Sequence, residues 1–113
     1  MKKNKQDTAL QRTYINFQAW ARANNIYHSI VTLNLELWGF VYHSKYGEYL
    51  IAVNDRLSNN IQKEVFCHEV EHIFNDLPEH SYIIGVDMQH AKIERNADKR
   101  ASAVMETAAN FFD

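Results

Sequence analysis

The stretch from residue 26 to residue 54 is the feature that most restricts the fold of this 113-residue chain. It is rich in β-branched and aromatic residues, in the segments IYHSIVTL, LWGFVYH and EYLIAVN, and the turn-forming SKYG lies between the last two. We therefore expect three short strands, of which the last two form a hairpin. The flanking segments carry apolar residues at helical spacing instead, so the sequence predicts a small α+β domain.

Three helices are expected around these strands. The first begins at Thr8, which has capping-box spacing to Gln11, and stops at Asn24-Asn25. The second starts within the segment 57–60, which is a loop and helix start, and ends before Pro78, the only proline. A closing helix follows. The apolar stripes of the last two helices are Ile61, Val65, Ile73 and Leu77, and then Ile93, Ala97, Ala101, Val104, Ala108 and Phe111.

Length, net charge and composition restrict the functions that the protein can have. A chain of 113 residues suits one domain, 1–113, whose basic residues 1–6 are expected to form a frayed tail. A net charge of -2 without a basic stripe argues against direct binding to nucleic acid. No apolar run is long enough to cross a membrane, and the start of the chain leads into no signal core, so we expect a cytoplasmic protein.

The segment FCHEVEH, in the middle of the second predicted helix, carries the chemistry. His68 and His72 are four residues apart, so they lie on one helical face about 6 Å apart along the axis, where both imidazoles can reach one zinc ion. Glu69 projects beside them, in a position to take a proton from water as a general base. The alternative is a helical face that carries two imidazoles and binds no metal.

A catalytic zinc site needs a third protein ligand. In the segment KIERNADKRA, Glu94 and Asp98 are four residues apart, hence on one face of the closing helix. We expect Glu94 to complete the zinc site and Asp98 to accept a hydrogen bond from a ligand histidine. The alternative is an exposed acidic pair that Arg95 and Lys99 neutralise.

These motifs resemble, in order and spacing, those of the ImmA/IrrE family of zinc metallopeptidases. The resemblance covers residues 47 to about 104: a strand ending in Asn54, the HExxH segment 68–72, and Glu94 followed by Ala97 and Asp98. It implies a zincin-like fold of the gluzincin type, with two histidines and one glutamate on zinc. It also implies a protein substrate or partner, namely a helix-turn-helix repressor of a prophage or mobile element, which family members cleave or otherwise inactivate.

Three further residues near the motif are candidates for contact with the substrate or with the oxyanion of a tetrahedral intermediate. His90 is expected one turn before Glu94 on the closing helix, and His80 and Tyr82 are expected in the loop before it. Cys67, the single cysteine, cannot form an internal disulfide and is expected to be a buried thiol.

The remaining aromatic residues and histidines have simpler expected roles. Trp20 and Trp38 are expected to anchor the core, and His28 and His43 to be solvated or hydrogen-bonded residues of strands.

The sequence thus predicts a zinc-dependent endopeptidase in which a substrate strand pairs with an exposed sheet edge. Two other functions stay open. The first is a regulator that keeps the zinc fold and inactivates its partner by binding without cleavage. The second is an interaction domain whose His/Glu cluster binds no metal.

Overall fold

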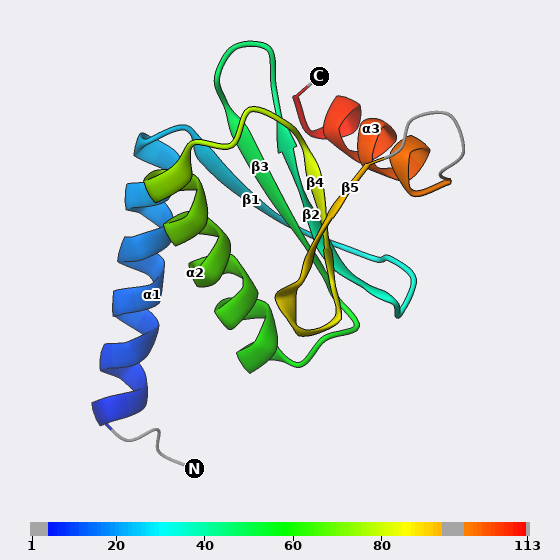
Figure 1. Ribbon diagram of the computed structural model, residues 1–113. Coiled ribbons are helices and arrows are strands. Elements are labelled where there is room, and N and C mark those ends of the chain that lie inside the picture. The colour runs from blue at the N-terminus through cyan, green and yellow to red at the C-terminus, as the bar shows by residue number, and fades with distance from the viewer. Residues whose placement is uncertain (1–4, 94–98, 113) are drawn as a thin grey trace.

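The computed structural model describes residues 5–93 and 99–112 and shows a small α+β domain of three helices and a five-stranded mixed sheet (Figure 1). In chain order the elements are α1 (Lys5–Ala23), β1 (Ile26–Val31), β2 (Leu37–His43), β3 (Tyr49–Asn54), α2 (Asn59–Asp76), β4 (Tyr82–Gly85), the 3₁₀ turn η1 (Val86–Met88), β5 (His90–Lys92) and α3 (Lys99–Phe112). None of the helices in these two ranges has the length and hydropathy of a membrane span.

The sheet has the order β1-β3-β2-β4-β5, with β1 parallel to β3 and every other pair antiparallel. The three strands expected between residues 26 and 54, including the β2–β3 hairpin, are confirmed. The expectation of a three-stranded sheet is wrong, because β4 and β5 extend it to five. These two strands have only four and three residues, too few to establish an alternating pattern in the sequence.

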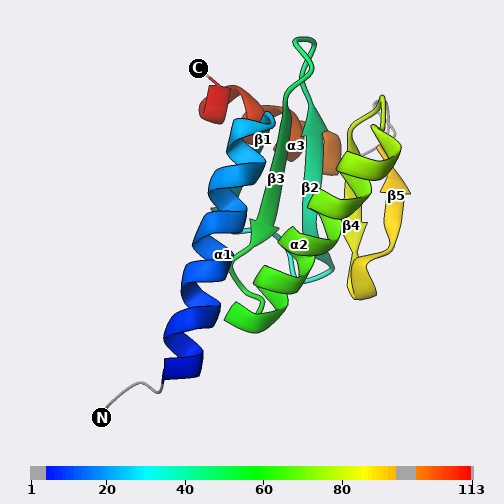
Figure 2. The same cartoon turned by 90° about the vertical axis from the view of Figure 1, so that its left-hand side faces the viewer.

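Two layers of helices enclose the sheet. Helices α1 and α2 lie side by side on one face and α3 covers the other (Figures 1 and 2). The larger core lies between α1, α2 and the sheet, and the smaller one joins Phe40 and Ala52 to Val104 of α3. The central strand β3 is buried at all six positions, since it has a neighbouring strand on each side and a helix on each face.

Several boundaries differ from those expected. Helix α1 begins at Lys5, so part of the predicted tail is helical. Ile93, expected in the closing helix, directly follows β5 instead, and α3 starts at Lys99. Trp38 packs against the larger core as expected, whereas Trp20 is 42% exposed. Cys67 is exposed as well, so the expectation of a buried thiol is wrong.

Asn54, at the end of β3, holds the adjoining loops together from a fully buried position. Its Nδ2 donates to the carbonyl oxygens of Leu37 over 2.7 Å, Asn34 over 3.0 Å and Leu33 over 3.2 Å. Its Oδ1 accepts from the backbone N–H groups of Leu33 and Arg56. One side chain therefore satisfies backbone groups of both the β1–β2 loop and the turn that leads into α2.

Replacing Asn54 by alanine should destabilise the fold by about 2–4 kcal/mol, since one buried and four partly buried hydrogen bonds to the backbone would be lost at once. Asn16→Ala, at an exposed position of α1, is the matched control and should change stability by no more than about 0.5 kcal/mol. Urea unfolding of the three proteins measures the difference. Equal midpoints for Asn54→Ala and the parent would contradict this account of the loops.

His28, on β1, is packed as a neutral imidazole. Its ring lies 4.2 Å from that of Phe66, and the Gln18 amide donates to Nδ1 over 2.9 Å, which leaves the ring proton on Nε2. The buried Nε2 has no hydrogen-bond partner among the described residues. Burial lowers the pKa of His28 from 6.5 to about 4, because an imidazolium would lose its hydration there.

The lowered pKa predicts a pH dependence of stability. Between pH 6.5 and about 4 the unfolded chain binds a proton at His28 and the folded protein does not, so stability falls as the pH falls through this window. His28 should account for about 1–3 kcal/mol of that loss. The test compares the free energy of unfolding of the parent and of His28→Phe at pH 7 and at pH 4.5, with chelator present in every sample. If both proteins lose the same stability between these pH values, His28 is not responsible for the loss.

Candidate metal centre

Helix α2 carries the predicted motif and is fixed at both ends. The Ser58 hydroxyl accepts from the backbone N–H of Ile61 over 3.3 Å, which caps the N-terminus. Leu77 closes the C-terminus in the left-handed conformation, with a φ of 46°, and its N–H bonds to the carbonyl of Ile73 over 2.9 Å. Pro78 follows, so the predicted end of this helix is confirmed.

Glu69 occupies a core position of α2 and is 0% exposed. It is the only charged residue on the buried side of the helix, whose members are Val65, Phe66, Glu69, Val70 and Ile73. A carboxylate removed from water requires hydrogen-bond donors in compensation. The donors around Glu69 therefore decide what its carboxylate can do.

Tyr82 and His90 supply those donors from the neighbouring strands β4 and β5. The Tyr82 hydroxyl donates to Glu69 Oε1 over 2.6 Å, and His90 Nε2 lies 2.9 Å from Oε2. His90 pairs with Ile84 across the two strands, and Tyr82 is two residues before Ile84 on β4. Tyr82 and His90 therefore lie on the same face of the sheet. Burial raises the pKa of Tyr82, as do the hydrogen bond to Glu69 and its charge, so the phenol remains protonated.

Three histidines, His68, His72 and His90, form the more accessible side of a cluster that also contains Glu69 and Tyr82. The ring centroid of His90 lies 4.7 Å from that of His72 and 6.3 Å from that of His68. Ligand atoms of His68, Glu69 and His90 all lie within 4.8 Å of one another, so these three side chains could hold a metal ion. His68 is exposed, while the side chains of His72 and His90 are partly covered.

Asp76 supports His72 from one turn further along α2. The distance between His72 Nδ1 and Asp76 Oδ2 is 2.9 Å, and this contact leaves Nε2 of the ring available to a ligand. A carboxylate that orients a ligand histidine is the role predicted for Asp98. The i, i+4 spacing of His72 and Asp76 on a predicted helix was the signal in the sequence that could have identified Asp76.

The other predicted site residues lie as follows. Glu94 and Asp98 fall outside the described residues. His90 belongs to β5, so its expected place on the closing helix is wrong, and Tyr82 belongs to β4 and not to a loop. His80 is exposed between α2 and β4, and within the described parts of the chain no contact links it to the cluster.

The chemistry of these donors suits zinc, which accepts imidazole nitrogens and carboxylate oxygens in a tetrahedral arrangement. Bonds of about 2.1 Å place tetrahedral ligand atoms about 3.4 Å apart. The ligand atoms of His68, Glu69 and His90 lie within 4.8 Å of one another, and His90 Nε2 is 2.9 Å from Glu69 Oε2. Rotations about the side-chain bonds of the accessible histidines would adjust this spacing to a tetrahedral site.

Comparisons with known proteins do not extend this description: the chain matches no protein-family model, no curated protein and no solved structure. The resemblance to the ImmA/IrrE family therefore stays a prediction from its motifs, and the zincin-like fold with it.

The cluster predicts tight binding of about one zinc ion per chain at neutral pH. His68→Ala and His72→Ala should each abolish most of the affinity, and Asp76→Ala should reduce it by about 10- to 100-fold because the His72 ring loses its support. His80→Ala is the control, since this exposed histidine lies outside the cluster. Competition with a chromophoric chelator measures the affinities.

A metal centre at this position would be ruled out if the parent, His68→Ala and His72→Ala bound zinc equally.

Proposed function

We propose that the protein is a zinc-dependent endopeptidase that acts in the cytoplasm. The observation that supports this most is the position of Glu69, a fully buried carboxylate on α2 between two accessible histidines. A buried carboxylate costs stability unless it is paired, and its place beside metal-binding side chains is typical of a functional site.

The proposed zinc ligands are His68, His72 and Glu94, the set that the resemblance implies. His90 is the described residue that faces both histidines, so it is the rival for the third position. The two can be separated by metal binding: Glu94→Ala removes most of the affinity if Glu94 is the ligand, and His90→Ala does so if His90 is. Either result is compatible with a zinc hydrolase that keeps one position open.

When bound, zinc would supply the Lewis acidity that makes water a nucleophile near neutral pH. Glu69 is the residue that would accept a proton from the attacking water and later donate it to the leaving amine. Tyr82 and His90 hold the carboxylate by one oxygen each, which fixes its direction before the substrate arrives. Rotation of His90 away from Oε2 would release that oxygen for proton transfer.

The proposed substrate is a helix-turn-helix repressor of a prophage or mobile element, presented as an extended segment. In the sheet formed by the described residues, β5 is an edge strand, and it carries His90. An extended peptide paired with this edge would pass directly beside the cluster, with its backbone hydrogen bonds satisfied by the strand.

One observation favours a second function, a regulator that binds the repressor without cleaving it. Both oxygens of Glu69 are already engaged, one of them by a phenol at 2.6 Å. In that case the carboxylate is a structural bridge between α2 and the strands, and no proton transfer passes through it. Metal at the site would then stabilise the fold of a binding surface.

Glu69→Gln separates the two functions. The amide is nearly isosteric and keeps hydrogen-bonding capacity but cannot accept a proton as a carboxylate does, so cleavage should fall by about 100-fold or more. Glu64→Gln, at an exposed position five residues earlier on α2, is the matched control and should cleave like the parent. The assay follows cleavage of the helix-turn-helix repressor encoded nearest to this gene, with a chelator-treated sample beside it.

If the parent leaves the repressor intact, while the parent and Glu69→Gln release it equally from its operator, the enzyme proposal is wrong and the binding function replaces it.

A further inference from the structure

Strand β5 has a neighbouring strand on one side only within the described parts of the chain. It comes last in the sheet order, pairs with β4, and lies at the side of the sheet away from α1 (Figure 2). Its three residues are exposed, half-buried and exposed, whereas all six residues of the central strand β3 are buried. The second edge of β5 therefore presents backbone N–H and C=O groups to solvent.

The hydrogen bonds between β4 and β5 decide which backbone groups face this open edge. Beside the turn, the Gly85 N–H donates to the Gln89 carbonyl oxygen over 2.7 Å, so these two residues form a hydrogen-bonded pair. Such pairs alternate with non-hydrogen-bonded pairs along an antiparallel ladder. The next hydrogen-bonded residue of β5 is Ala91, whereas His90 and Lys92 direct their N–H and C=O groups away from β4.

The side chains of the same two residues lie on the face of the sheet that carries the cluster. Residues two apart on a strand share a face, so Lys92 lies on the same face as His90, and Ala91 lies on the other. Across the ladder, Lys92 pairs with Tyr82, whose hydroxyl donates to Glu69. The residues that open their backbone groups at the edge are therefore those whose side chains belong to the cluster or lie beside it.

We propose that this edge binds an extended polypeptide segment antiparallel to β5, through the backbone of alternate residues of the segment. One residue of the segment exchanges two hydrogen bonds with His90, and the residue two positions earlier exchanges two with Lys92. Both must have a free N–H group, whereas the N–H of the residue between them faces solvent. The inference rests on the proposed function for the identity of the segment as a substrate, and it adds the register in which that substrate lies.

This register defines the class of segment that the site accepts. Proline has no N–H group, so it is excluded at the positions opposite His90 and Lys92 and tolerated at the position opposite Ala91. Directly opposite residues of an antiparallel ladder have their side chains on the same face, so the two hydrogen-bonded residues of the segment point toward the face of the cluster. Side-chain specificity therefore comes from residues that are two apart in the segment.

A separate segment fits this edge better than a second copy of the chain does. Two β5 strands that paired over their whole length would place Lys92 of each copy opposite His90 of the other, with no acidic side chain on either strand. Lysine on an edge strand is a common protection against the pairing of two sheets. A single segment that brings no sheet of its own, and no lysine opposite His90, avoids this conflict.

Two synthetic peptides of alternating threonine and valine test the register by binding alone, with chelator present so that no cleavage occurs. The first is N-methylated at alternate residues, so its backbone N–H groups lie along one edge, and the second is N-methylated at every residue. Amide hydrogen exchange, followed residue by residue by NMR, is the readout. The first peptide should slow exchange at His90 and Lys92 about tenfold when it occupies about nine-tenths of the protein, and the second should slow neither.

Lys92→Pro gives the decisive comparison, because it removes one outward N–H group and no hydrogen bond to β4. Lys92→Ala is the matched control, since it removes the same side chain and keeps the N–H. The first peptide should bind Lys92→Pro about fivefold more weakly than Lys92→Ala, as expected for the loss of one hydrogen bond. Slow exchange of the Ala91 N–H in both variants verifies that β5 still pairs with β4.

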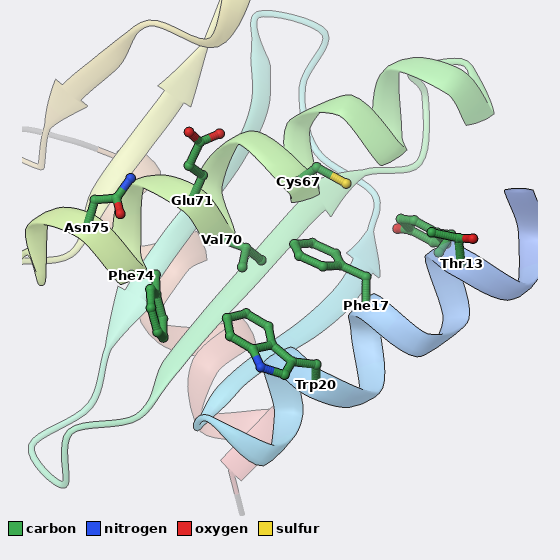
Figure 3. A pocket seen from close by; sticks show the side chains of 9 residues that line it. Thr13, Phe17, Trp20, Cys67, Val70, Glu71, Phe74 and Asn75 are labelled. Carbon is green, nitrogen blue, oxygen red and sulfur yellow. The ribbon is translucent and has the colours of Figure 1, made fainter.

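The groove between α1 and α2 is the other place where a valine-containing peptide could bind (Figure 3). Phe74 lines this groove and is 54% exposed, so Phe74→Ala reduces the apolar surface of the groove and leaves the core closed. This variant should bind the first peptide as the parent does.

The inference is wrong if the two peptides protect the parent equally, or if Lys92→Pro and Lys92→Ala bind the first peptide equally. It is also wrong if protection is confined to the other edge strand, β1, or appears without peptide and grows with protein concentration, since the occupant would then be a second copy. Cleavage by the parent would leave the peptidase function standing in each of these cases. Protection of His90 and Lys92 without any cleavage would support the binding edge and not the peptidase.

Discussion

The buried carboxylate of Glu69 is the interaction on which the arrangement of the site depends. It lies on the core side of α2, where leaving it without partners would cost more than most single contacts contribute. Its donors, Tyr82 and His90, are 13 and 21 residues further along the chain. Residues of β4 and β5 therefore compensate the burial of this carboxylate on α2.

The same contact orients the accessible groups. Glu69 is directed inward to Tyr82. His68, one residue before it on α2, and His72, three residues after it, lie at the outer edge and face His90 on β5. A helix and a strand pair thereby bring three imidazoles to one surface above a carboxylate. The apolar core supports this surface from below, so the imidazoles are positioned by rigid elements and not by loops.

The sequence was most informative where the pattern was long. The strands from 26 to 54 are predictable because they lie in extended β-rich stretches, and helix α2 is predictable because it has a helix start at 57–60 and a stop at Pro78. Strands β4 and β5 were missed since their stability comes from pairing with distant partners, which leaves no local period.

The wrong expectations at the site have the same cause, because they too concern contacts between distant segments. The apolar stripe that begins at Ile93 predicts a helix near His90, whereas His90 lies in a three-residue strand. Its contact with Glu69 depends on β5 pairing with β4, which no spacing in the sequence reveals. Asp76, by contrast, can be identified from the sequence, because it is four residues from His72 on a predicted helix. The choice of Glu94 and Asp98 rests on sequence alone, because they lie outside the described residues.

Between residues 67 and 76, α2 alternates between two surfaces. The cluster contains His68, Glu69, His72 and Asp76, and a groove between α1 and α2 is lined by Cys67, Glu71, Phe74 and Asn75 on the α2 side. Both sets of side chains stand on one hydrogen-bonded helix. An occupant of the groove that displaced α2 would therefore displace the residues of the cluster as well. Whatever factor an occupant of the groove applies to metal affinity, the metal must apply to the affinity of that occupant.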